Sequence, residues 1–446
     1  MKRITWLILI LAFKIFAALP AQGIIVEKHI LPENGLTVLL NESRRVPRCT
    51  VYLWYKVGSR DEEPGKTGSA HFFEHFMYKG NKFVKPDEQD DAVMRCRGTL
   101  NASTGIDRTD YYQTVSCECL EGMLRFEAAR MRFLKEGMTQ ENFDSERRIV
   151  LAELEERGSA PYGQAFKTLL KQAYPQGHPY QWTPIGSIED LKAWTLDDAR
   201  KFFSTYYVPN NAVLSISGDI DSRKTLEMAR KWFGTIKPGP TPPPAKVTPN
   251  TDGVAVLRGE IEDPNIQIPL VMLAYRIPGK GQPGWMEISI LTKMLAEDQS
   301  SPLVQNLQYQ RRLVMSVDSD VMDFQLGDLL LVSAKPAPGK SPKEVEAAIR
   351  EQIKRILEKG PDPGELDGLK KILQTESLLA LQGTLAIARS LAENEAVYRD
   401  PNYLEKQIEK IDTIDQENML KIARQYLRDE NSTVLFILPK GQGGSQ

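Results

Sequence analysis

The stretch IKPGPTPPPAKVTPNTDG, residues 236–253, carries six prolines. Proline lacks a backbone N–H donor and favours extended polyproline conformation, so we interpret residues 236–252 as a linker. The linker separates residues 24–235 from residues 253–446 in a chain of 446 residues. Each part is long enough to bury its own hydrophobic core, and two domains are therefore predicted.

The two parts share a sequence pattern. At an offset of 220 residues, the strand-like run LWYKV at 53–57 falls on LAYRI at 273–277. Near the ends of the two parts, residues 199–214 resemble residues 423–435 when small gaps are allowed. In both parts strands come first, helical patterns follow, and a strand closes. The expected fold class is α+β, with two similar α/β-sandwich domains that form an internal repeat.

Periodicity gives the expected elements. In the second part, long amphipathic helices are predicted at 342–358 and 364–383. In the first part, the strands are predicted at 34–42, 48–58, 99–119 (a strand pair) and 211–217. The helices of the first part are predicted at 66–79, 86–97, 120–135, 139–157, 162–173 and 196–206.

The N-terminus has the pattern of a targeting segment. A basic start at residues 1–3 precedes an apolar run that Lys14 interrupts, and small residues follow. This pattern predicts a secretory signal peptide over residues 1–22, cut between Ala21 and Ile24, and a periplasmic or secreted protein with no stable membrane anchor after cleavage. The alternative is an uncleaved signal anchor, although a spanning helix needs about 20 apolar residues.

The four cysteines, Cys49, Cys96, Cys117 and Cys119, all lie in the first third of the chain. Export permits disulfides, and four cysteines allow three complete pairings, among which the spacing does not choose. Cys117 and Cys119 stand two apart in the predicted strand pair and would face the same way. A zinc site of four thiolates would lack the usual Cys-x-x-Cys spacing, which argues against it.

The overall charge is nearly balanced. With 57 Lys+Arg and 59 Asp+Glu, the net charge is -2. No basic excess favours binding to nucleic acid or to an anionic membrane. Evidence for function must therefore come from local motifs.

Two of the four histidines lie in one pentapeptide, His71-Phe72-Phe73-Glu74-His75, on the predicted helix 66–79. Side chains at i and i+4 share one face of a helix, so both imidazoles can reach one zinc ion. Glu74 lies beside them, where it can act as a general base that takes a proton from water. His-x-x-Glu-His is the inverted form of the zincin motif and predicts a metallopeptidase rather than two packing histidines.

A catalytic zinc site usually has three protein ligands and one open position. Glu153, on the predicted helix 139–157, is the candidate third ligand, although Glu155 and Glu156 are alternatives by spacing alone. Glu146 stands two turns earlier on the same face of that helix. It is a candidate for a carboxylate that orients a ligand.

The internal repeat provides a comparison for these assignments. At an offset of 220, the pentapeptide falls on LTKML at 291–295, so the second copy has the helix without the metal groups. At an offset of 223, Glu146 falls on Leu369, whereas Glu153 falls on Glu376. The first copy is therefore predicted to carry the metal site, and the second copy is predicted to have only a structural role. The retained Glu376 shows that a helix carboxylate alone does not define a metal site.

Along nearly all of both parts, the sequence resembles the pitrilysin or insulinase family of zinc peptidases. Within that family it is similar to the zinc-bearing subunit of two-chain bacterial members and to the beta subunit of the mitochondrial processing peptidase. The matching stretches are Gly68-Ser69-Ala70 before the pentapeptide, Lys79-Gly80, Gly98 to Thr104 with Asp107, Thr109 and Tyr111, Leu120-Glu121, Arg130-Met131, Glu146 to Glu153, and His178-Pro179-Tyr180 through Gly186 to Tyr206 and Asn211.

The resemblance implies a zinc-dependent endopeptidase that forms half of a clamshell around a chamber. It implies that His71, His75 and Glu153 hold one zinc ion, that Glu74 is the general base, and that Glu146 supports the site. It also implies an edge strand to which a substrate adds as an extra strand, which favours short unfolded peptides. This substrate-binding strand comprises Leu100, Asn101, Ala102, Ser103 and Thr104.

Some residues near these motifs have other interpretations. Asn101 can equally be a turn-forming residue. His178 has no second ligand beside it and is interpreted as a loop or packing residue. His29 stands in the first strand region and carries no functional signal.

One departure from the family pattern bears on partners. Full members carry an Arg and a Tyr that hold the substrate and stabilise the oxyanion, but here Gln308 and Met315 stand at those positions. Methionine has no hydrogen-bond donor. The resemblance therefore implies a heterodimer with a homologous non-zinc subunit that supplies the Arg/Tyr pair. The alternatives are a homodimer in which Tyr309 or Arg311 serves in trans, and a non-catalytic peptide-binding or assembly subunit.

Overall fold

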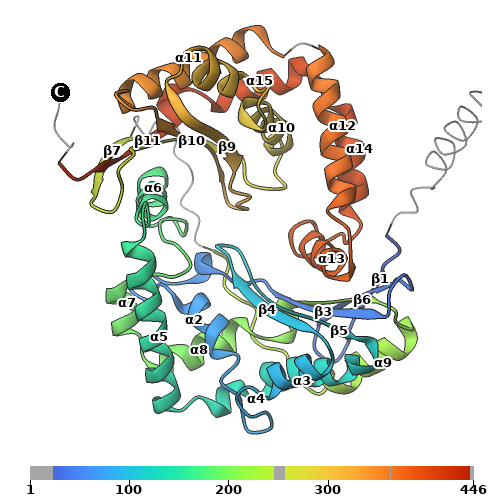
Figure 1. Ribbon diagram of the computed structural model, residues 1–446. Helices are drawn as coiled ribbons and strands as arrows, with labels where there is room; N and C mark the ends of the chain where they lie inside the picture. The colour runs from blue at the N-terminus through green and yellow to red at the C-terminus, as the bar shows by residue number, and fades with distance from the viewer. Residues whose placement is uncertain (1–23, 246–256, 362, 442–446) are drawn as a thin grey trace, which may run out of the picture.

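The computed structural model describes residues 24–245, 257–361 and 363–441, and Figure 1 shows two sheets with helices packed against them. The predicted signal peptide, residues 1–22, lies outside the described residues, as does the end of the predicted linker. Within the described part of the chain, no helix is both long enough and apolar enough to cross a membrane.

The first sheet has six strands: β1 (Glu27–Ile30), β2 (Thr37–Glu42), β3 (Arg48–Tyr55), β4 (Thr99–Thr104), β5 (Thr109–Ser116) and β6 (Ala212–Gly218). Their order is β1-β2-β6-β3-β5-β4. β2 and β6 are parallel, and the other neighbours are antiparallel. β4 therefore lies at an edge, where the backbone groups on its outer side have no neighbouring strand among the described residues.

The second sheet has five strands: β7 (Leu257–Asp263), β8 (Leu270–Ile277), β9 (Val314–Val321), β10 (Asp328–Pro336) and β11 (Ser432–Pro439). Their order is β7-β11-β8-β10-β9, with β7 and β11 parallel and the other neighbours antiparallel. This repeats the order and directions of β2-β6-β3-β5-β4. The predicted internal repeat and α+β fold class are confirmed, and β3 and β8, which carry the matched runs, hold the same position in each sheet.

Helices follow the strands in both parts. In the first part they are η1 (Ser59–Asp61), α2 (Ser69–Phe76), α3 (Glu88–Arg95), η2 (Cys117–Cys119), α4 (Leu120–Gly137), α5 (Gln140–Ser159), α6 (Ala165–Ala173), α7 (Ile188–Ala193), α8 (Leu196–Tyr206), η3 (Pro209–Asn211) and α9 (Ser222–Phe233). In the second part they are α10 (Trp285–Ala296), η4 (Val304–Gln310), α11 (Pro342–Lys359), α12 (Pro363–Leu379), α13 (Thr384–Tyr398), α14 (Tyr403–Thr413), α15 (Gln416–Tyr426) and η5 (Asp429–Asn431).

Both sheets have helices packed on two faces. On one face of each sheet, the packed helix belongs to the other half of the chain. In β3, Val51 and Leu53 face the helices of the first part, whereas Tyr52 and Trp54 alternate to the opposite face and pack with Leu391 of α13. This alternation follows from the two-residue period of a strand. Two buried faces explain why β3 is apolar along its whole length.

The exchange is reciprocal, because α6 packs on the second sheet. Leu169 and Leu170 of α6 share a buried cluster with Met272 of β8 and Leu435 of β11. Figure 1 shows α6 beneath the upper sheet and α13 above the lower one. The prediction of two α/β-sandwich domains did not specify this exchange of helices between the halves. Amphipathic periodicity shows that a helix has an apolar face but not which sheet covers it.

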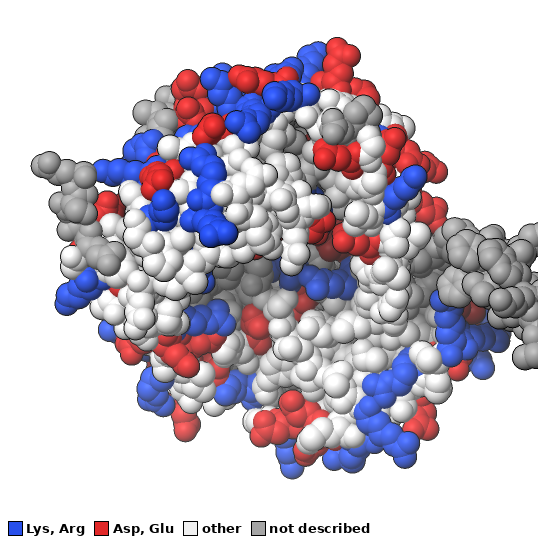
Figure 2. Space-filling view, turned by 45° about the horizontal axis from the view of Figure 1, so that its top comes forward, with Lys and Arg blue, Asp and Glu red and all other residues white. Residues whose placement is uncertain are grey.

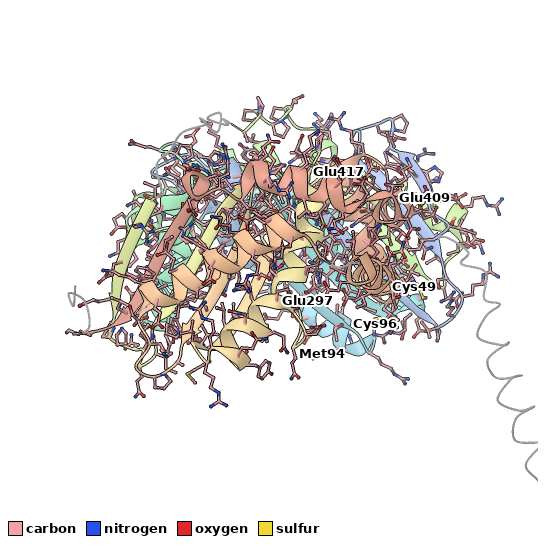
Figure 3. The ribbon with its side chains drawn as sticks, turned by 90° about the horizontal axis from the view of Figure 1, so that it is seen from above. Cys49, Met94, Cys96, Glu297, Glu409 and Glu417 are labelled. Atoms are coloured by element: carbon pink, nitrogen blue, oxygen red, sulfur yellow. A yellow bond between two sulfur atoms is a disulfide. The ribbon has the colours of Figure 1, made fainter. Side chains whose placement is uncertain are left out.

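Two disulfides join Cys49 to Cys117 and Cys96 to Cys119. Cys117 and Cys119 do not continue the predicted strand. β5 ends at Ser116, and the two cysteines lie in the short turn η2, from which they reach different partners. All four thiols are thereby used, which excludes a site of four thiolates. Figure 3 labels Cys49 and Cys96 on the same side of the molecule.

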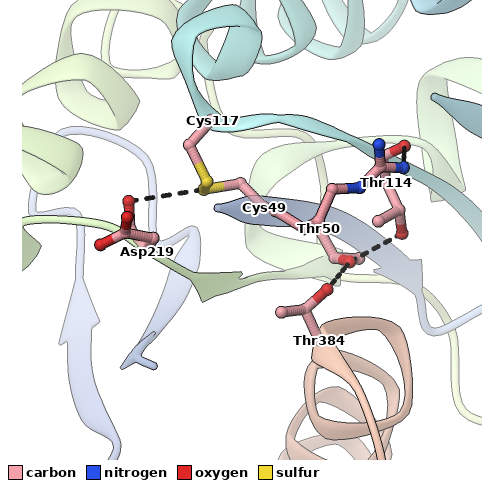
Figure 4. The surroundings of a disulfide bond; sticks show 7 residues. Cys49, Thr50, Thr114, Cys117, Asp219 and Thr384 are labelled. Carbon is pink, nitrogen blue, oxygen red and sulfur yellow. Dashed lines mark hydrogen bonds between the residues drawn. A yellow bond between two sulfur atoms is a disulfide. The ribbon is translucent and has the colours of Figure 1, made fainter. Parts of the chain in front are cut away.

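The first disulfide lies beside a contact between the two halves. Figure 4 shows Thr50, next to Cys49, between Thr114 and Thr384. The Thr50 hydroxyl is 2.7 Å from the Thr114 hydroxyl and 2.8 Å from that of Thr384, at the start of α13. α13 is thus held to the first sheet by a buried polar contact as well as by apolar packing.

Candidate metal centre

The pentapeptide lies on α2, whose start is fixed by Glu62. Gly68 precedes the helix with φ 93° and has no side chain to cap it. The carboxylate of Glu62 instead accepts hydrogen bonds from the backbone N–H groups of Gly68 (2.9 Å) and Ala70 (2.8 Å). A Cβ at position 68 would lie 2.9 Å from the carbonyl oxygen of Ile185. The positive φ and the close approach both require glycine there.

The apolar side chains of α2 fix its orientation. Phe72, Phe73 and Phe76 are buried in the core of the first sheet. Glu74 and His75 are half-buried on another side of the helix, and His71 is buried. The sequence of α2 therefore separates a packing face from a face that carries the polar groups, as the helical period requires.

α5 packs against α2 and brings two carboxylates to the histidines. Nε2 of His75 lies 3.3 Å from Oε2 of Glu153, and Nε2 of His71 lies 3.8 Å from Oε1 of Glu153. The ligand atoms of these three residues all lie within 4.8 Å of one another. Glu155 and Glu156 are exposed on α5, so among the three candidates Glu153 is the one that meets the histidines.

Glu146 orients the second histidine. Nδ1 of His75 lies 3.2 Å from Oε1 of Glu146, whose other oxygen is 2.7 Å from Nζ of Lys79. The hydrogen bond to Glu146 raises the pKa of His75. Although burial acts to raise the pKa of Glu146, the hydrogen bonds from His75 and Lys79 lower it below its ordinary value. Glu146 thus keeps a proton on Nδ1 of His75 and leaves Nε2 free to bind a metal.

His71 is neutral in this setting. Burial is the main reason why its pKa falls to about 3, and the neighbouring His75 and Arg157 add to the effect. A neutral imidazole is the form that binds a metal ion. Arg157 is also ion-paired with Oε1 of Glu153.

The geometry of the three residues fits a zinc ion. Oε2 of Glu153 is buried and has no hydrogen-bond partner among the described residues. Zinc bound at about 2.0–2.2 Å holds tetrahedral ligand atoms roughly 3.3–3.6 Å apart, which matches the separation of Glu153 from His75. Two imidazoles and one carboxylate are also a common ligand set for catalytic zinc.

β4 borders two pockets that meet at Glu74. The first, of about 560 Å³, is lined by Glu74, His75, Tyr78, Lys79, Pro86, Asp87, Asp90, Leu100, Asn101, Ala102, Glu146 and Ile149. We call it the Asp90 pocket. The second, of about 420 Å³, is lined by His71, Glu74, Ser103, Thr104, Leu154, Arg157, Gly158, Gly163, Gln164, Phe166, Lys167, Thr183, Pro184 and Ile185. We call it the Lys167 pocket.

The predicted substrate residues therefore lie on the edge strand beside Glu74. Asn101 is in β4 and its side chain accepts from the N–H of Ala102, so it is not part of a turn. Figure 2 shows a hollow between the two halves whose wall carries both Lys or Arg and Asp or Glu atoms.

The other histidines lie apart from this centre. His178 is buried and stacks on Tyr174, and its Nδ1 accepts from the N–H of Tyr180 at 3.1 Å, which is the packing role expected from the sequence. His29 is on β1, 3.3 Å from a carboxylate oxygen of Glu27.

The residues at the expected Arg and Tyr positions lie at an edge of the second sheet. Gln308 is in η4, and Met315 is exposed on β9. Arg311 is ion-paired with Glu351 of α11 at 2.9 Å, and Tyr309 is exposed. Arg311 is therefore already paired within the described chain, whereas the side chain of Tyr309 is open to solvent.

Three contributions were missed at the sequence level: the cap by Glu62, the ion pair of Lys79 with Glu146, and the ion pair of Arg157 with Glu153. The last is an i, i+4 pair that helical spacing could have indicated. The other two join residues whose proximity depends on the tertiary fold.

Two protein-family descriptions match the chain. Residues 37–181 match "Insulinase (Peptidase family M16)", and residues 193–373 match "Peptidase M16 inactive domain". The second match begins within the first half of the chain and crosses the predicted linker.

Known proteins match along almost the whole chain. The zinc protease PqqE of Helicobacter pylori is 30% identical and covers 98% of this chain and 99% of its own length. The probable beta subunit of the mitochondrial-processing peptidase of Arabidopsis thaliana is 22% identical, over 91% of this chain and 77% of its own length. A crystal structure of a protease from Helicobacter pylori has a TM-score of 0.88 and 29% identity, over 94% of this chain and 100% of its own. The chain therefore belongs to the pitrilysin/insulinase family, peptidase family M16, whose relatives are named zinc proteases.

Proposed function

We propose that the chain is a zinc-dependent endopeptidase that hydrolyses short unfolded peptides, with His71, His75 and Glu153 as ligands of one zinc ion. The observation that carries the proposal is the convergence of these three residues beside Glu74 and an edge strand. Zinc bound there would polarise the scissile carbonyl and lower the pKa of water.

Glu74 is the general base in this proposal. It lines both pockets, so it lies at the point where a peptide running along β4 would pass between them. Glu74 takes a proton from water and later passes it to the leaving amine. Glu146 keeps the Nδ1 proton of His75 in place while this happens.

The substrate class follows from β4. A peptide that adds to this edge pairs its main chain with the strand, and only an extended segment can do so. Residues Leu100 to Thr104 supply that edge, and folded proteins would be excluded.

The same proposal assigns a partner and a location. Gln308 and Met315 supply neither a cation nor a hydroxyl for an oxyanion, so a homologous non-zinc subunit would supply an Arg/Tyr pair in a heterodimer. The domain limits 24–235 and 253–446, the signal peptide and a periplasmic or secreted location belong to this proposal. The alternative is a peptide-binding or assembly subunit without turnover, which the exposed Met315 favours.

The test is to prepare the chain alone and together with a homologous non-zinc subunit, measure bound zinc, and assay cleavage of an unstructured fluorogenic peptide. Glu74→Gln should lower kcat by about a hundred- to ten-thousand-fold while zinc content is unchanged. Full turnover by Glu74→Gln would overturn the mechanism. Full activity of the isolated monomer would overturn the partner, and zinc binding without turnover in any preparation would favour the assembly subunit.

A further inference from the structure

Glu74 lines both the Lys167 pocket and the Asp90 pocket, and apart from Glu74 the charges without a partner in the two pockets have opposite sign. In the Asp90 pocket, Lys79 is paired with Glu146, whereas Asp87 and Asp90 have no side-chain partner among the described residues. In the Lys167 pocket, Arg157 is paired with Glu153. Lys167 is half-buried and has no hydrogen-bond or ion-pair partner in the described chain.

A second group in the Lys167 pocket is also without a partner. The hydroxyl oxygen of Thr104 is buried and has no hydrogen-bond partner among the described residues. Thr104 is the last residue of β4, so this donor lies at the end of the proposed substrate strand. A buried polar group without a partner is costly, and a ligand that accepts its hydrogen bond would remove the cost.

Much of the remaining wall of the Lys167 pocket is apolar and can pack against the methylene groups of a substrate side chain. Leu154 is buried, and Phe166, Pro184 and Ile185 add apolar surface. Methylene groups would pack against these residues, while an acceptor at the tip would reach an ammonium and a hydroxyl.

We propose that the Lys167 pocket binds a carboxylate of the peptide substrate, either an acidic side chain beside the cleaved bond or the C-terminal carboxylate of a short peptide. This inference rests on the proposed peptidase function and names part of its substrate class. Asp87 and Asp90 repel a carboxylate from the opposite pocket, so the two pockets together fix which way a charged peptide lies along β4.

The test measures binding separately from turnover. The zinc-loaded full chain carrying Glu74→Gln is titrated with short fluorescent peptides that have Glu, Gln or Lys at one position, for each position near the cleaved bond. The Glu peptide should bind about fivefold more tightly than the Gln peptide at one position. Lys167→Gln should remove this preference, and Lys167→Glu should reverse it in favour of Lys.

Lys171→Gln is the matched control, because Lys171 is exposed on the same helix and does not line the pocket. It should leave the preference unchanged. A second arm compares free with amidated C-termini. A preference lost on amidation assigns the carboxylate to the peptide terminus, and one lost only on Glu-to-Gln exchange assigns it to a side chain.

The outcomes separate this inference from the proposed function. If the wild-type chain cleaves peptides, but Glu and Gln forms bind equally or the preference survives in Lys167→Gln, the pocket assignment is overturned alone. If the charge preference is found but no preparation hydrolyses any peptide, the pocket stands and the peptidase function fails.

Discussion

The helix pair α2 and α5 has a counterpart in the second half, α10 and α12. Both pairs pack a helix that carries a glutamate against a second helix, but the glutamate meets different side chains in the two pairs. In the first pair, Glu153 of α5 meets two imidazoles on α2. In the second pair, the matching Glu376 lies 3.6 Å from Nζ of Lys293 on α10. In the second copy the partner of the helix carboxylate is thus a cation of the chain itself.

Exposure differs as well. Leu291 and Leu295, which match His71 and His75, are completely buried, and Met294, which matches Glu74, is only 9% exposed. In the first copy His71 is buried as well, but Glu74 and His75 are half-buried beside the pockets. The matched side chains of the second copy are thus inaccessible, whereas the helix of the first copy has side chains that a ligand can reach. The comparison teaches that the helix pair is held by packing, and that the proposed metal chemistry depends on which face is left accessible.

The largest difference between the two copies is expected when each of the matched carboxylates, Glu153 and Glu376, is removed in turn. We expect Glu153→Gln to lose bound zinc and all measurable turnover, because the amide is a much poorer ligand than the carboxylate. Glu376→Gln should retain both. Elemental analysis and peptide cleavage measure the two outcomes, and zinc retention by Glu153→Gln would show that the third ligand is another residue.

The origin of these assignments shows what sequence can and cannot provide. The pentapeptide predicted two ligands and the base through helical spacing, and the repeat in 53–57 and 273–277 indicated the duplicated sheet. Spacing alone did not distinguish Glu153 from Glu155 and Glu156 as the third ligand, because the choice depends on how α5 is rotated against α2. The exchange of α6 and α13 was also not predicted, because a helical period does not specify which sheet a helix covers.

The two disulfides are confined to the first copy, since the second copy contains no cysteine. Loss of the 23-residue loop closed by Cys96 and Cys119 should destabilise the chain by about 2–4 kcal/mol. Both thiols are half-buried, so Cys96→Ser with Cys119→Ser should create little additional strain. Guanidinium unfolding of the oxidised double variant measures the effect. A free energy of unfolding equal to that of the wild type would show that this disulfide does not stabilise the first copy.

Glu146 has no acidic counterpart, because Leu369 takes its place in the second copy. We expect Glu146→Gln to weaken zinc binding by about 10- to 100-fold, since the amide no longer holds the Nδ1 proton of His75 as firmly. Competition with a chelator measures the affinity. Unchanged affinity, together with unchanged kcat, would mean that Glu146 serves only as the partner of Lys79.

The smallest effect is expected for Lys293→Met, which removes the cation of the second copy. The side chains of Lys293 and Glu376 are 37% and 49% exposed, and the pair is therefore worth less than about 1 kcal/mol. Lys293 also contacts Glu297 at 2.9 Å, and methionine keeps the helical preference and most of the apolar stem. The free energy of unfolding should change by only a few tenths of a kcal/mol, and turnover should not change. A loss of several kcal/mol would mean that the ion pair holds α10 to α12, and packing alone would then no longer explain why the second copy keeps its shape without a metal.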